Sequence, residues 1–201
     1  MQENQGHSEA LTSRVYDLQK VVLGANLGFL PFMLIFLVTE ARYSIATCVI
    51  LWLLTTWVII NEWWSMSDTF RTAPSNSKRI VFISLLYTVG LLCLPACLLV
   101  TETADIALGW YVGLLLFLSL LDIPFSLLYR AEPDINATDR GEFLTYVYFD
   151  IFLVILYGIA LYLTLTLTVL PLVKVIIVAV FYLLEFVSEH RFVPHIARQF
   201  S

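Results

Sequence analysis

Two aspartates stand inside long apolar stretches of this sequence. Asp122 lies in Leu-Leu-Asp-Ile-Pro-Phe, and Asp150 lies in Tyr-Phe-Asp-Ile-Phe. Where such stretches cross a membrane, an ionisable side chain is costly to bury and by default indicates a functional site. A carboxylate in a low-dielectric environment either holds a proton or is offset by a cation. The two aspartates are therefore candidates for a proton relay or a cation pathway.

Hydroxyl groups accompany both aspartates at helical spacing. Residues three, four or seven positions apart share one face of an α-helix, so each aspartate belongs to a polar stripe. Because the two helices are consecutive and antiparallel, we expect the two carboxylates at nearly equal depth in the membrane. The hydroxyl residues counted in the stripes are Ser119 and Ser126 beside Asp122, and Tyr146 and Tyr157 beside Asp150.

Two further apolar stretches end in acids, Glu62 in one and Glu185 with Glu189 in the other. With the aspartates they predict an acidic cluster in one half of a helical bundle, with arginine only at its edge. Three interpretations remain open at this point. The cluster passes cations or protons, or its members accept hydrogen bonds that lock the helices together, or the acids form a collar that docks a soluble partner. The docking candidates are Asp68, Arg71, Arg130, Glu189 and Arg191.

The composition is that of a membrane protein. The chain has 201 residues, of which 60% are hydrophobic and only 13% charged, and its mean hydropathy is +0.85. A soluble domain carries about a quarter charged residues. The net charge of −5 and the lack of basic runs argue against direct contact with nucleic acid. The lipid bilayer is thus the expected surrounding.

We predict an all-α fold, a polytopic bundle of about six transmembrane helices, because six stretches approach the roughly 20 residues that cross a bilayer. Residues 1–20 form a polar N-terminal segment, 21–187 the transmembrane domain and 188–201 a tail. No strand-like alternation suggests a barrel, so helices must satisfy the backbone in lipid. The predicted spans are 21–39, 44–64, 80–101, 107–129, 143–166 and 169–187.

Basic residues predict the orientation, because cytoplasmic connections carry an excess of Lys and Arg. Nine of the 11 basic residues fall on the side of the two termini and of the 65–79 and 130–142 loops. The other side receives Arg42, together with Lys174, which lies near a helix end and is expected to snorkel outward. Both termini are therefore expected in the cytoplasm, and the 101–106 connection, acidic through Glu102 and Asp105, on the outer side.

The sequence lacks the motifs of common enzymes and metal sites. It has no Gly-x-Ser-x-Gly, no His-Glu-x-x-His and no P-loop. His7, His190 and His195 are all terminal, so the apolar stretches contain no histidine to serve as a general base. Cys48, Cys93 and Cys97 lie in apolar segments, where thiols usually behave as small hydrophobes. We expect no enzymatic activity, no metal centre and no cofactor.

These observations favour a small channel-like or transporter-like subunit with an acidic intramembrane cluster for cation or proton passage. Six helices enclose little space, so we expect a homo-oligomer or complex subunit, with a pore between protomers. The alternative is a membrane sensor or anchor that recruits a soluble cytoplasmic partner, as in signalling or antiphage systems. We expect a bacterial or archaeal plasma membrane for either.

The orientation can be tested at Asn136 in the 130–142 loop. In a cysteine-free background, a cysteine placed there should not react with a membrane-impermeant maleimide in intact cells, and should react after lysis. A cysteine placed at Arg42 should react already in intact cells. Reaction at position 136 in intact cells would contradict the predicted topology.

Overall fold

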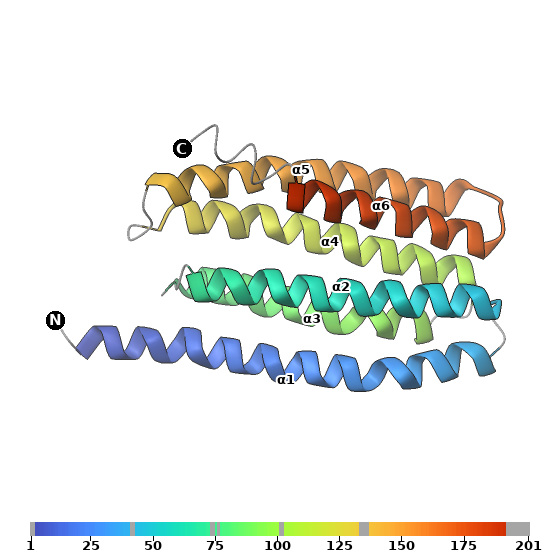
Figure 1. Cartoon of the computed structure of the whole chain (residues 1–201), viewed down its shortest axis with the longest axis horizontal. Helices are drawn as coiled ribbons and strands as arrows, with labels where there is room; N and C mark the ends of the chain where they lie inside the picture. Colours follow the sequence, from blue (N-terminus) through green and yellow to red (C-terminus); the bar gives the residue numbers. More distant parts are fainter. Residues whose placement is uncertain are drawn as a thin grey trace.

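The computed structural model of the chain consists of six α-helices in antiparallel succession (Figure 1). It describes residues 3–40, 43–72, 75, 77–100, 103–132 and 137–191, and within them the side chains except at 3–14, 66–68, 70–72, 100, 137–139 and 191. No strand occurs in these ranges, so the predicted all-α class is confirmed. The helices are α1 (Glu3–Thr39), α2 (Ile45–Thr72), α3 (Lys78–Val100), α4 (Ala104–Arg130), α5 (Ala137–Thr166) and α6 (Pro171–Arg191).

All six helices contain a segment long and apolar enough to cross a membrane. Large apolar side chains also cover their outer faces, among them Phe32, Trp57, Ile155 and Leu183, which are exposed. Helices that are apolar both inside and outside the bundle belong in lipid rather than in water. The chain is therefore a polytopic integral membrane protein.

Several helices are longer than the sequence predicted. The first was expected at 21–39 and begins at Glu3, the second was expected to end near 64 and continues to Thr72, and the fifth begins at Ala137 rather than 143. Hydropathy marks where the chain leaves an apolar layer, whereas the helical hydrogen-bond ladder continues through polar residues with good helix propensity. Much of the polar segment 1–20 and of the predicted 65–79 loop is consequently helical.

The helices are arranged in two parts joined through α3 and α4. Helix α1 packs on α2 and α3, while α4 packs along α5, and α6 lies against α5, α2 and α4. In Figure 1 the first turns of α1 lie at the left end of the bundle, and α6 runs back toward that end. Side chains from most of the helices fill one continuous core, including Leu51, Leu94, Tyr111 and Val178.

A glycine permits the close approach of α3 and α4. A Cβ atom at Gly90 would lie 2.6 Å from Cδ2 of Leu118, a buried residue of α4. Real side chains do not approach this closely, so any larger residue at position 90 would require the Leu118 side chain or the helices to shift. This contact fixes how α4, which carries Asp122, sits against the first part of the bundle.

We expect Gly90→Ala to destabilise the protein by about 1–3 kcal/mol, because overpacking a close contact forces the helices or Leu118 to shift. Gly113→Ala is the matched control, since nothing lies within 4 Å of a Cβ there. Thermal unfolding in detergent measures both. In a double-mutant cycle with Leu118→Ala, the combined loss should be smaller than the sum of the two single losses. Equal stability of Gly90→Ala and Gly113→Ala would contradict the close approach.

Candidate functional site: an acidic cavity between four helices

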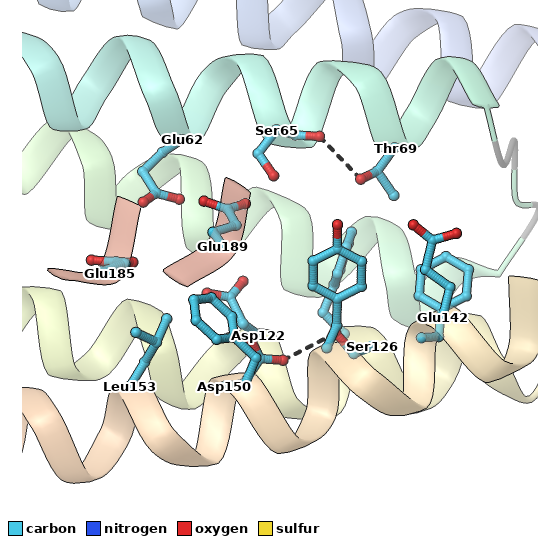
Figure 2. Close-up of a pocket in the computed structure, with 14 residues that line it drawn as sticks. Glu62, Ser65, Thr69, Asp122, Ser126, Glu142, Asp150, Leu153, Glu185 and Glu189 are labelled. Carbon is cyan, nitrogen blue, oxygen red and sulfur yellow. Dashed lines mark hydrogen bonds between the residues drawn. The ribbon is translucent and has the colours of Figure 1, made fainter. Parts of the chain in front are cut away.

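A cavity of about 330 Å³ lies between α2, α4, α5 and α6. It occupies the end of the bundle at which α2 ends and α5 begins, because Thr69 and Glu142 are among its lining residues (Figure 2). We call this the cavity end. Six carboxylates line the cavity, namely Glu62, Asp122, Glu142, Asp150, Glu185 and Glu189.

Helical periodicity explains why four helices each present polar groups to this space. In α5 the lining residues Glu142, Tyr146 and Asp150 follow one another at intervals of four, so they share one face. At a rise of 1.5 Å per residue, the eight positions from first to last span about 12 Å along the axis. The same spacing places Asp122 beside Ser126 on α4, and Glu185 beside Glu189 on α6.

Hydroxyl groups donate hydrogen bonds to three of the acids. The Ser126 Oγ donates to Oδ2 of Asp150 over 3.1 Å, an interaction between α4 and α5 visible in Figure 2. The Tyr157 hydroxyl donates to the Glu185 carboxylate, joining α5 to α6. The Tyr87 hydroxyl of α3 donates to Glu62 of α2. Each bond satisfies one carboxylate oxygen in an apolar surrounding without bringing a compensating charge.

Compensating bases are missing from the described lining. None of the described residues around the cavity is Lys, Arg or His. The nearest recorded base is His190, whose Nδ1 lies 3.9 Å from Oε2 of Glu189, and its side chain is half exposed. Several carboxylates that share a low-dielectric space repel one another unless protons or cations offset them. The cavity is therefore suited to hold positive charge.

The structure places most of the predicted pathway residues together. Asp122, Asp150, Glu62, Glu185, Ser126 and Tyr146 all line the cavity. Tyr157 lies behind the lining and donates to Glu185. Ser119 does not reach the cavity, because it is buried and its hydroxyl donates to the Leu115 carbonyl over 3.1 Å. Their role in ion or proton passage stays a prediction.

One acid of the cavity, Glu142, was not predicted as a member of the acidic cluster, although its spacing of four to Tyr146 and eight to Asp150 was the available signal. Glu189, counted in the predicted cluster and also among the docking candidates, lines the cavity one turn beyond Glu185. Of the other docking candidates, Arg130 is exposed at the end of α4, and the side chains of Asp68, Arg71 and Arg191 lie outside the described part.

One basic residue differs from its predicted position. Lys174 was expected to snorkel outward, but its side chain is 3% exposed and its Nζ lies 2.8 Å from Oδ1 of Asp105. The Asp105 carboxylate, in the first turn of α4, pairs with the Lys174 ammonium in place of water. This ion pair lies at the end of the bundle opposite the cavity.

Among the described residues, no three His, Cys, Asp or Glu side chains are grouped so as to hold a metal ion. Cys48, Cys93 and Cys97 are free thiols. Cys97 Sγ lies 3.0 Å from the Leu94 carbonyl in its own helix, as a thiol packed in an apolar helix often does.

No protein family, curated protein or solved structure shows significant similarity to this chain.

We expect Tyr157→Phe to lower stability by about 1–3 kcal/mol, because it leaves the buried Glu185 carboxyl without its donor. Tyr162→Phe is the matched control, since the Tyr162 side chain is 65% exposed. Thermal unfolding in detergent, read by loss of helical circular dichroism, compares the two. The interpretation of Tyr157 as a structural donor fails if both variants unfold at the same temperature.

Proposed function

We propose that this protein moves positive charge, as protons or as a cation, across the membrane by way of the acidic cavity. The observation that carries the proposal is the lining itself. Carboxylates from four helices share one space inside an apolar bundle, and no base is present among the described residues around it.

The size of the cavity supports a hydrated site. Its volume of about 330 Å³ is far above the roughly 10–15 Å³ that a polar cavity needs to hold one water molecule. Water lowers the cost of charging the carboxylates, while the shared negative field concentrates positive ions. Hydroxyls of Ser65, Thr69, Ser126 and Tyr146 add uncharged oxygen groups to the lining.

The cavity occupies only one end of the bundle. Toward the opposite end, the space between the helices is filled by buried side chains such as Leu108, Val112 and Val175. The Tyr111 hydroxyl accepts a hydrogen bond from Thr55 over 3.3 Å within this core. A protomer with one open end and one packed end favours a carrier that exposes its site to each side in turn, rather than an open channel.

The test is transport by purified protein in liposomes. With an inward-negative potential, the wild type should carry protons, read by an internal pH dye, or a monovalent cation, read by an isotope. Asp122→Asn and Asp150→Asn keep side-chain size and remove the charge. Each should reduce the flux at least about tenfold, equivalent to roughly 1.4 kcal/mol, while leaving elution volume and thermal unfolding unchanged.

Asp17→Asn is the matched control, because Asp17 is an exposed acid, 68% accessible, that pairs with Lys20 outside the cavity. Its flux should equal that of the wild type. Two results would contradict the proposal. One is a wild-type flux no higher than that of protein-free liposomes for protons, sodium and potassium. The other is full flux in both aspartate variants, which would leave the cavity acids a purely structural role.

A further inference from the structure

An ion pair between a buried lysine and an exposed aspartate joins the first turns of α4 and α6. Lys174 Nζ lies 2.8 Å from Asp105 Oδ1, with the lysine side chain 3% exposed and the aspartate 62% exposed. Lys174 is the single basic residue buried among the described side chains. An ammonium in such a place needs a partner, because an unpaired charge in an apolar surrounding is very costly. The exposed Asp105 means that the pair also lies at the edge of the packed core.

The helices joined by this pair are two of the four that build the acidic cavity. Helix α4 carries Asp122 17 residues beyond Asp105, which is about 25 Å along the helix at 1.5 Å per residue. Helix α6 carries Glu185 11 residues beyond Lys174, about 16 Å along the helix. Figure 1 shows both helices running from one end of the bundle toward the other. The pair thus lies on two of the helices that line the cavity, at the opposite end of the bundle.

Helix α6 makes fewer close backbone approaches to its neighbours than α4 makes to α5. Helix α4 packs extensively along α5, and a Cβ atom at Gly109 of α4 would lie only 3.0 Å from Leu165 of α5. Helix α6 is held to the bundle mainly by side chains, among them Glu185, which accepts a hydrogen bond from Tyr157 of α5. Helices α4 and α5 are therefore the more closely packed pair. The Lys174–Asp105 ion pair ties the first turn of α6 to α4.

We propose that the Lys174–Asp105 ion pair is a gate that closes the end of the bundle opposite the acidic cavity. The inference rests on the proposed function, because a carrier needs a closure on the side that its site does not face. A cation that arrives at the exposed Asp105 carboxylate competes with the Lys174 ammonium for it. Once displaced, Lys174 sits one turn from a helix end and reaches water along the membrane interface. The first half of α6 is then free to move from α4 and to open a route to the cavity.

Cysteine accessibility in nanodiscs tests the gate, since both faces of the membrane are then open to reagent. Val178→Cys, in a cysteine-free background, reports on opening, because Val178 is buried one turn beyond Lys174. Lys174→Met and Asp105→Asn each break the pair. Each should raise the rate of reaction with an impermeant maleimide at position 178 by at least about tenfold, through a shift toward the open state. The charge-swapped variant, Asp105→Lys with Lys174→Asp, should return the rate close to the wild-type value.

Two control cysteines separate opening from other effects. Leu170→Cys, at a site 72% exposed, should react equally in all variants. Leu94→Cys, in the core of α3 at 0% exposure, should stay unreactive unless the bundle unfolds. If position 94 becomes reactive in Lys174→Met alone, that variant has unfolded. The reactivity of position 178 is then judged from Asp105→Asn and from the charge-swapped variant. Unchanged reactivity at position 178 in a folded broken-pair variant overturns the gate, as does a charge swap that fails to restore closure.

The liposome flux assay on the same proteins distinguishes the gate from the proposed function. Cation flux in the wild type, with no change at position 178 on breaking the pair, leaves the function standing and removes the gate. A tenfold change at position 178 without flux of any tested cation leaves a real closure in a protein that does not transport, so the proposed function fails. Flux together with reversible opening supports both.

Discussion

The gathering of carboxylates around one cavity inside an apolar bundle, with Asp150 and Glu185 buried, is the constraint on which the rest of this structure depends. Hydroxyls of Tyr87, Tyr157 and Ser126 satisfy oxygens of Glu62, Glu185 and Asp150. These donors carry no charge, so they position the acids without neutralising them. An internal arginine or lysine would have neutralised the site permanently. The described lining contains neither. The compensating charge must therefore come from protons or cations, which can leave. A site compensated in this way is suited to exchange its positive charge with solution.

The distribution of charge along the bundle axis is equally one-sided. The acids gather at the cavity end, whereas the buried Lys174 lies at the other, about 16 Å along α6 from Glu185. At that distance the lysine compensates Asp105 locally and does little for the cavity. At one end, α4 and α6 therefore carry acids whose charge is offset only from solution. At the other end, they carry the Lys174–Asp105 pair, whose two charges offset each other. This asymmetry gives the two ends of the bundle different chemistry, which two-sided access to one site requires.

Much of this arrangement was predictable, because depth in a membrane follows from counting helical turns in antiparallel helices. That reasoning brought Asp122, Asp150, Glu62 and Glu185 to one level, and the structure places them around one cavity. The rotation of each helix was not predictable, because it depends on contacts such as Gly90 against Leu118. Ser119, expected beside the acids, lies outside the lining, one turn of α4 before Asp122, and its hydroxyl donates to the Leu115 carbonyl. The pairing of Lys174 also escaped prediction, since its partner lies 69 residues away in sequence.

Helix α6 connects these features. It contributes Glu185 and Glu189 to the cavity and Lys174 to the opposite end, so charge at either place acts on it. Helix α5 packs more closely on α4 than α6 does. In the proposed mechanism, positive charge entering the cavity would reduce repulsion between α6 and the acids of α4 and α5, and would draw the last turns of α6 inward. A cation at Asp105 would act at the opposite end by removing the partner of Lys174. Because a rigid helix transmits a tilt from one end to the other, both events would act on the same element, and α6 would couple occupancy of the cavity to closure at the far end.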